Sequence, residues 1–204
     1  MIIIVDYGSG NLFSIQNMFT RIGVETVISS ESSTIAKAGK LILPGIGAFD
    51  SCMQKVNQSG FLEDLNQKVM KEKIPVLGIC VGMQLMMEGS EEGVLPGLGW
   101  IKGRTIKFKQ NQLSAGYKVP HMGWAEVELK KPSKLMDDMY DDPRFYFAHS
   151  YHVAPENESH TLLCALNGYS FTAAIECDNI MGVQFHPEKS HKYGMKLLEN
   201  FARL

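Results

Sequence analysis

Short β-branched runs alternate with amphipathic stretches through the first half of the chain, and no other feature limits its possible folds as strongly. Residues 2–5, 25–28 and 40–43 suit strands, and the stretches between strands carry apolar residues at helical spacing. Strands joined by helical crossovers form a parallel sheet, with right-handed connections. Residues 74–79 are apolar throughout, which predicts a central strand buried on both faces.

The helices of this half are predicted from the same spacing. Apolar residues recur at helical positions after Ser9, namely Leu12, Ile15, Met18, Phe19 and Ile22. Ser9 is therefore the expected N-cap of that helix. Another helix is expected at residues 61–70, where apolar side chains share one face and charges occupy the other.

The second half changes to shorter strands. They are expected at residues 124–129, 144–153, 161–166, 171–177 and 180–185. A turn at Asp178 and Asn179 makes the last two strands a hairpin. Apolar spacing after Pro187 predicts a closing helix, and the polar stretch 107–118 is expected to be a surface loop or hairpin tip.

Nothing in the sequence divides residues 1–204 into parts: we find no repeat, low-complexity tract or long linker, and this length suits one large domain. The predicted fold is therefore a single three-layer α/β domain. Its open sheet is mixed but largely parallel at its centre, with helices on both faces. Ligands bind such sheets at the carboxyl ends of the strands, so we expect the site there.

Charge and composition exclude several classes of function. Lys and Arg number 20 against 22 Asp and Glu, a formal net charge of −2, which argues against a nucleic-acid binder. The longest apolar runs are far shorter than the roughly 20 residues of a membrane span. The N-terminal residues lack a secretory pattern, so we expect a cytoplasmic protein. The cysteines have no CxxC spacing, which fits neither a disulfide framework nor a zinc site: Cys52, Cys80, Cys164 and Cys177.

The most specific local motif is the sequence G-I-C-V-G around Cys80, which follows an apolar strand and leads into a helical stretch. It resembles a nucleophile elbow, in which Gly78 and Gly82 allow a strained turn and close packing of strand and helix. The helix N-terminus would lower the pKa of the thiol and leave the amide of Val81 free to bind an oxyanion. The alternative is a buried core cysteine beside a glycine turn.

A second motif near the C-terminus places His186 and Glu188 in a rigid turn at the end of a strand. Together with Cys80 they make a complete triad: His186 would take the thiol proton and Glu188 would orient the imidazole. Taken alone, this motif is also consistent with a turn carrying solvated polar residues. The two motifs together, in this chain order and on these elements, favour catalysis.

These motifs match a known family. G-I-C-V-G-M-Q followed far downstream by F-H-P-E-K-S resembles the class I, triad-type glutamine amidotransferases. Four further segments are similar to the glutaminase subunits of imidazole glycerol phosphate synthases: residues 6–12, 44–49, 118–124 and 145–151. The resemblance spans the whole chain and implies a flavodoxin-like fold, with no cofactor and no metal.

The resemblance also implies a mechanism. Cys80 would attack the side-chain amide of glutamine, giving a glutamyl thioester and ammonia, and water would release glutamate. A flip of the Gly45–Ile46 peptide would aim the amide of Ile46 at the oxyanion, alongside that of Val81. Glutamine would be held by Gly45, Gln84, Glu92, Ser150 and Tyr151. From the residues alone, Gln84 and Glu92 are equally consistent with solvated helix positions, and Ser150 and Tyr151 with ordinary strand positions. His149 and His152 receive no role, since residues three apart on a strand point to opposite faces.

Ammonia released into water is lost, so the resemblance implies a partner that receives it. That partner is a (βα)8-barrel cyclase subunit, which makes imidazole glycerol phosphate and aminoimidazole carboxamide ribotide in histidine biosynthesis. The interface would include Asn11, Met122, Trp124 and Lys189, although Trp124 also suits a core position and Lys189 a solvated one. Three alternatives stay open: a glutaminase subunit for another synthase, a free-standing hydrolase of γ-glutamyl or peptide bonds, and a non-catalytic binding subunit.

Overall fold

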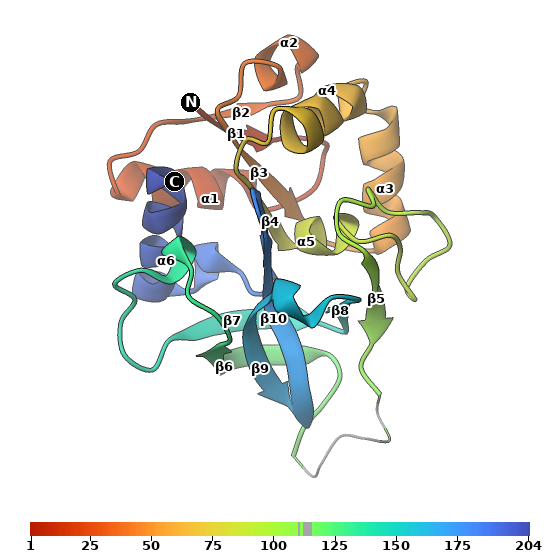
Figure 1. Cartoon of the computed structure of the whole chain (residues 1–204), viewed down its shortest axis with the longest axis vertical. Coiled ribbons are helices and arrows are strands. Elements are labelled where there is room, and N and C mark those ends of the chain that lie inside the picture. Colours follow the sequence, from red (N-terminus) through yellow and green to blue (C-terminus); the bar gives the residue numbers. More distant parts are fainter. Residues whose placement is uncertain (110, 112–115) are drawn as a thin grey trace.

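The computed structural model describes residues 1–109, 111 and 116–204. Its strands form a single mixed sheet of eleven members (Figure 1). They are β1 (Ile2–Val5), β2 (Thr26–Ser29), β3 (Lys40–Gly45), β4 (Val76–Cys80), β5 (Gly103–Lys107), β6 (His121–Leu129), β7 (Arg144–His149), β8 (Tyr151–Pro155), β9 (Thr161–Asn167), β10 (Tyr169–Cys177) and β11 (Ile180–Val183). No helix in the described part of the chain is long and apolar enough to cross a membrane.

The parallel half of the sheet has the order β2-β1-β3-β4-β11, with every neighbouring pair parallel. This is the flavodoxin-like strand order. β4 lies between β3 and β11 and is buried along its whole length, which confirms the central strand expected from the apolar run. The order continues antiparallel through β10, β9, β6 and β7, while β5 and β8 pair at the side. The predicted mixed sheet, parallel at its centre, is confirmed.

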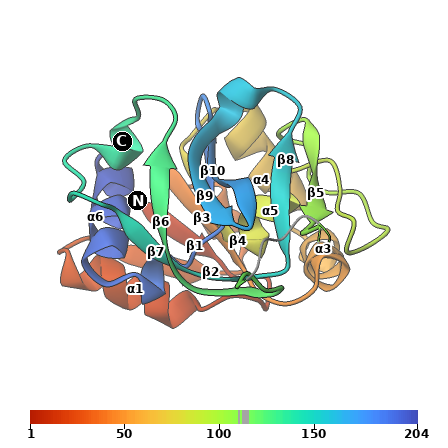
Figure 2. The same cartoon turned by 90° about the horizontal axis from the view of Figure 1, so that it is seen from below.

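Helices cover both faces of the parallel strands, as predicted. Their bounds are α1 (Leu12–Arg21), α2 (Ser32–Ile35), α3 (Phe49–Gln58), α4 (Leu62–Asn66), α5 (Val81–Leu85) and α6 (His191–Arg203). α1 and α6 lie on one face, and α3, α4 and α5 lie on the other (Figures 1 and 2). The helix expected at residues 61–70 is α4 continued by a π-helical turn, Gln67–Lys71.

Ser9 is not the N-cap of α1, which corrects the sequence-based prediction. α1 begins at Leu12, and the hydroxyl of Ser9 bonds the backbone of Ile46 instead. The intervening Gly10 has φ +109°, and a Cβ there would lie 2.7 Å from Pro44 Cβ. The loop after β1 therefore passes directly against the end of β3, and this brings Ser9 to β3 rather than to α1.

The strand expected at residues 144–153 is two strands, which is a second correction. β7 ends at His149 and pairs with β6, whereas β8 begins at Tyr151 and pairs with β5 and β10. The change of partners at Ser150 reorients the chain, so His149 and His152 do not point to opposite faces. Both rings pack on Phe108, with centroids 5.2 and 4.8 Å from its ring centre.

The remaining predictions for the second half agree with the structure in part. β10 and β11 form the expected hairpin, with Asp178 at φ +52° in the turn. α6 is the closing helix. The stretch 107–118 begins at the last residue of β5 and includes the buried Phe108. Residues 110 and 112–115 of that predicted loop lie outside the described residues.

Candidate active site

The turn from β4 into α5 places Cys80 at the carboxyl end of the central strand. Cys80 has φ +55° and ψ −113°, a conformation that costs energy in a residue with a Cβ. Gly78 and Gly82 make the turn possible, because a Cβ at either position would overlap backbone atoms of Met83 or Leu43. This strained turn flanked by glycines is the local structure that the motif predicted. Val81 begins α5, so its N–H has no acceptor within that helix.

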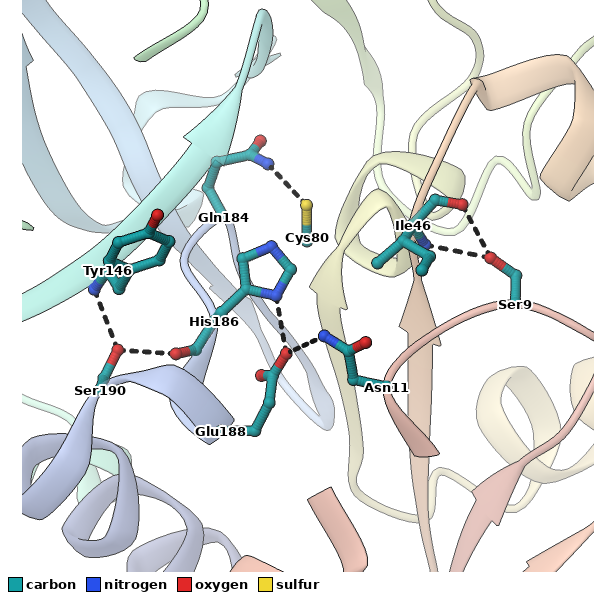
Figure 3. Close-up of polar contacts among 9 residues, drawn as sticks. All are labelled: Ser9, Asn11, Ile46, Cys80, Tyr146, Gln184, His186, Glu188 and Ser190. Atoms are coloured by element: carbon teal, nitrogen blue, oxygen red, sulfur yellow. Dashed lines mark hydrogen bonds and ion pairs between the residues drawn. The ribbon is translucent and has the colours of Figure 1, made fainter. Parts of the chain in front are cut away.

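His186 and Glu188 come from the turn after β11, the strand beside β4. His186 Nδ1 lies 2.8 Å from Glu188 Oε1, and the two side chains are 5% and 2% exposed. Asn11 Nδ2 donates a second hydrogen bond of 2.8 Å to the same oxygen. Figure 3 shows the imidazole between the thiol of Cys80 and the carboxylate. The structure thus brings together the three residues of the predicted triad from distant parts of the chain.

The electrostatics of this cluster favour a charged histidine. Burial lowers the pKa of His186, but the contacts with Cys80 and Glu188 outweigh burial and raise the pKa to about 9. Burial likewise raises the pKa of Glu188, yet hydrogen bonds from His186 and Asn11 hold it below its usual value. Glu188 is therefore a carboxylate that supports an imidazolium, as a base-orienting residue requires.

Ser190 fixes the turn that carries His186. Its hydroxyl, which is fully buried, donates to the carbonyl of His186 at 2.6 Å and accepts from the amide of Tyr146 in β7 at 3.0 Å. The amide of His186 in turn donates to Tyr146 O at 2.9 Å. Sequence reasoning missed this residue, and its only signal was its place at the end of the F-H-P-E-K-S motif.

The opposite side of the site is the chain after β3, where Ile46 follows Gly45. The amide of Ile46 donates to Ser9 Oγ at 3.1 Å, and its carbonyl accepts from the same hydroxyl at 2.8 Å. Cys52 Sγ also donates to that carbonyl, at 3.3 Å. The Ile46 amide predicted to bind an oxyanion is therefore engaged by Ser9 (Figure 3). Sequence reasoning missed this contact because it depends on β1 and β3 being neighbours in the sheet.

A cavity of 520 Å³ opens above the nucleophile, a size that suits a small ligand. The residues that line it come from the ends of the parallel strands and the segments that follow them, from α5 and the loop after it, and from Pro120 and β6 to β8. They are Asn11, Ile46, Gly47, Cys80, Val81, Gln84, Glu92, Pro120, Met122, Ala148, His149, Ser150, Tyr151, His186 and Lys189.

Four of the five residues predicted to hold glutamine line this cavity, namely Gln84, Glu92, Ser150 and Tyr151. Gln84 is buried, and its Nε2 donates to the carbonyl of Tyr151 and to Gln184 Oε1. Glu92 Oε2 accepts from the amide of Phe49, the first residue of α3. Gly45 lies just behind the wall, where a Cβ would press on the hydroxyl of Tyr7 and on Gly82. Gln84 and Glu92 are therefore not the solvated helix residues of the alternative interpretation.

Of the four residues predicted to contact a partner, three line the cavity and the fourth, Trp124, lies two residues from Met122 on β6. Asn11, Met122 and Lys189 line the cavity itself, and Met122 is 64% exposed. Trp124 lies on the same strand as Met122, in a neighbouring hollow with His191, and is 45% exposed. Trp124 is therefore a surface residue rather than part of the core. An exposed aromatic and an exposed methionine beside an active-site mouth are suited to burial by another protein.

Three histidines, the half-buried His121 and the buried His149 and His152, form a cluster around Phe108. His121 Nδ1 lies 3.1 Å from His149 Nε2, and His149 Nδ1 lies 2.7 Å from the carbonyl of Tyr151. Burial lowers the pKa of His121 to about 4 and that of His149 to about 3, so both are neutral near pH 7. Across the described ranges, no three His, Cys, Asp or Glu side chains are grouped so as to hold a metal ion.

Solved structures of other proteins share the fold described above. A crystal structure of a glutamine amidotransferase superposes with a TM-score of 0.75 at 15% identity, covering 100% of this chain and 98% of that chain. PurLQS from Thermotoga maritima superposes with a TM-score of 0.71 at 15% identity, covering 99% of this chain and 97% of that chain. At such identities the likeness concerns the fold alone.

Sequence comparison reaches the family. The model of the glutamine amidotransferase class-I family matches residues 3–204. The imidazole glycerol phosphate synthase subunit HisH 2 of Methanococcus maripaludis is 51% identical over 203 residues, covering 100% of this chain and 99% of that protein. Subunit HisH of Bdellovibrio bacteriovorus is 46% identical over 204 residues, covering 100% of both. The chain thus belongs to the class-I glutamine amidotransferases and, within them, to the family of HisH subunits of imidazole glycerol phosphate synthase.

Proposed function

We propose that this chain releases ammonia from glutamine at Cys80 and supplies it to a cyclase subunit of imidazole glycerol phosphate synthase. The observation that carries the proposal is that Cys80 and His186 line a cavity bordered by exposed apolar residues, with Glu188 bonded to the far nitrogen of His186. The HisH relatives support the choice of synthase over the other synthases considered from the sequence.

The chemistry follows from the positions of the side chains. Cys80 Sγ attacks the side-chain carbonyl carbon of glutamine. The carbonyl oxygen becomes an oxyanion, to which the amide of Val81 donates a hydrogen bond. His186 takes the thiol proton during this attack and passes it to the leaving nitrogen, so the C–N bond breaks and ammonia departs, leaving a glutamyl thioester. His186 then takes a proton from a water molecule whose oxygen attacks the thioester carbon. The C–S bond breaks, glutamate is released, and the proton on His186 returns to the sulfur to restore the thiol. Glu188 holds the imidazole and stabilises its charged form throughout.

The second oxyanion donor is the amide of Ile46, which Ser9 engages in this structure. Turning the Gly45–Ile46 peptide would break this hydrogen bond and aim the amide into the cavity. Gly47, at φ +94°, gives the next residue the freedom that such a turn needs. We therefore propose that the isolated chain has one effective oxyanion donor and the assembled synthase has two.

The partner completes the function, because ammonia becomes ammonium when it reaches water. We propose that a (βα)8-barrel cyclase docks over the cavity mouth, against Asn11, Met122, Trp124 and Lys189, and conducts ammonia to its own active site. The synthase products would be imidazole glycerol phosphate and aminoimidazole carboxamide ribotide. The exposure of Met122 and Trp124 beside the mouth supports this placement.

Glutamate release from glutamine tests the proposal. We would compare the chain alone, the chain with a cyclase subunit, and that pair with the cyclase's nucleotide ligand, with Cys80→Ala as the blank. We expect strong activation in the ligand-bound pair and no release with Cys80→Ala. Equal release in all three samples would indicate a free-standing hydrolase. The absence of release in every sample would indicate either a different partner synthase or a non-catalytic binding subunit.

A further inference from the structure

Gln184 has no part in the steps above, yet its side chain contacts the nucleophile. It directly follows β11 and precedes His186 by two residues. The side chain is fully buried, and its Nε2 lies 3.7 Å from Cys80 Sγ (Figure 3). Sulfur is larger than oxygen, so this is a hydrogen-bonding separation for an N–H donor. The thiol of Cys80 therefore has two polar neighbours, the amide of Gln184 and the imidazole of His186.

The direction of the Gln184 amide is set by a chain of contacts that begins at a backbone carbonyl. The carbonyl of Tyr151 can only accept, and Gln84 Nε2 lies 3.3 Å from it. The same Nε2 lies 3.1 Å from Gln184 Oε1, so both hydrogens of the Gln84 amide have acceptors. Gln184 is thereby held with its oxygen toward Gln84 and its NH2 group toward Cys80. A flipped amide would place oxygen against the sulfur and NH2 against the donor Gln84.

We propose that Gln184 is a positioning residue for the nucleophile: its side-chain amide donates a hydrogen bond to Cys80 Sγ, and Gln84 and the Tyr151 carbonyl hold that amide in the donating orientation. A thiol sulfur is a weak acceptor and a thiolate a stronger one, so the contact favours the charged form. It also restrains the side-chain rotamer of Cys80. The inference rests on the proposed function for its catalytic meaning, although the contact itself concerns only this chain.

The other titratable groups around the sulfur have different roles. His186 contacts it from the turn after β11, and Tyr7, in the loop after β1, is close enough to be influenced by its charge. Burial raises the pKa of Tyr7 well above 10, and its hydroxyl donates to Pro44 O, so Tyr7 stays neutral at working pH. Glu188 acts on the sulfur through His186. Gln184 is therefore a donor whose contribution to the thiolate does not change with pH, unlike that of His186.

The test is the pH dependence of Cys80 alkylation by iodoacetamide, followed by mass spectrometry of the Cys80 peptide. Gln184→Met keeps the length of the side chain and removes the donor. In Gln184→Met we expect the midpoint of the alkylation–pH profile, which reports the Cys80–His186 pair, to rise by about one pH unit. At pH values below the midpoint, alkylation should be about tenfold slower than in wild type. Gln84→Met keeps the donor and removes its anchor, so the shift should be smaller. The matched control is Gln54→Met, the same change on the exposed face of α3. A Gln184→Met profile that superimposes on the wild-type profile would overturn the proposal.

A second measurement uses the wild-type fold, in case Gln184→Met does not fold. The side-chain NH2 resonances of Gln184 should shift with pH at the alkylation midpoint, and this shift should vanish in Cys80→Ala. Resonances that ignore the titration would refute the hydrogen bond. Neither readout needs glutamine, a partner or a nucleotide. Failure of the coupled glutaminase and failure of this inference are therefore distinguishable.

Discussion

The two sides of the cavity that meet at Cys80 are in different states. On the β11 side, His186, Glu188 and Asn11 are already connected by hydrogen bonds of 2.8 Å. On the β3 side, the amide of Ile46 is occupied by Ser9. Under the proposed mechanism, this difference means that the nucleophile is assembled in the isolated chain while one oxyanion donor is withheld.

One loop touches both sides. The segment after β1 supplies Ser9, which engages Ile46, and Asn11, which donates to Glu188. Tyr7 of the same loop donates to the carbonyl of Pro44. Asn11 also lines the cavity mouth, where we propose that the partner docks. A partner that moves this loop could therefore release the β3 side without rebuilding the β11 side.

The largest expected effect is on the assembled side. Glu188→Gln removes the negative charge that stabilises the imidazolium of His186, so kcat for glutamate release by the assembled synthase should fall by about 10² to 10⁴-fold. Steady-state kinetics with the cyclase present measure the change. Glu63→Gln, the same change on the exposed face of α4, should have no effect. A loss no greater than that of Glu63→Gln would mean that the triad geometry does not drive the reaction.

The withheld side should respond in the opposite direction. Ser9→Ala removes both Ser9 hydrogen bonds to Ile46 and leaves the one from Cys52. Release of glutamate by the isolated chain should therefore rise by about tenfold, less than the roughly 10² to 10³-fold that a complete oxyanion donor contributes. Ser14→Ala, in an exposed position of α1, is the matched control. Unchanged or lower activity of Ser9→Ala without a partner would show that Ser9 does not restrain the peptide.

Asn11 tests whether the loop belongs to the catalytic side or only to the interface. Asn11→Ala removes one hydrogen bond to Glu188, so kcat at saturating cyclase should fall by about fivefold. Titration with the cyclase measures the dissociation constant separately. A raised dissociation constant with unchanged kcat would assign Asn11 to the interface alone.

The smallest effect concerns stability. The pKa of His186 is about 9 in the folded chain and near 6.5 when unfolded, so its contacts stabilise the fold fully below pH 6.5 and this stabilisation is lost as the pH rises to 9. Urea unfolding of wild type and His186→Gln should give free energies whose difference shrinks by on the order of 1 kcal/mol between pH 6 and 9.5. A constant difference would contradict the raised pKa.

The features predicted most accurately from the sequence are those that depend on residues close together in the chain. The all-apolar run before Gly78 indicated a central strand, and the glycines on both sides of Cys80 indicated a strained turn, because each signal is local. The triad could also be predicted, since His186 and Glu188 lie two residues apart at the end of a predicted strand. Sheets of this class bind ligands at the carboxyl ends of their strands. His186 and Glu188 were therefore expected at the same edge of the sheet as Cys80.

Contacts that depend on the order of strands in the sheet could not be predicted from the sequence. Ser9 was assigned to a helix cap because the sequence does not show that β1 lies beside β3. The Gln184 contact depends on the register of β11 with β4, which aligns Val183 with Ile79. The break at Ser150 was missed because both flanking segments have strand composition, and only the change of pairing partner separates them.

In the proposed mechanism the nucleophile of the isolated chain is ready while one oxyanion donor is withheld. Alkylation of Cys80 by iodoacetamide forms no oxyanion, so it reports the triad alone, whereas glutamate release requires both sides. The decisive measurement compares both rates in wild type and Ser9→Ala without a partner. We predict equal alkylation rates in the two proteins and about tenfold faster glutamate release in Ser9→Ala. Alkylation that accelerates together with release would contradict the account, because Ser9 would then restrain the nucleophile itself.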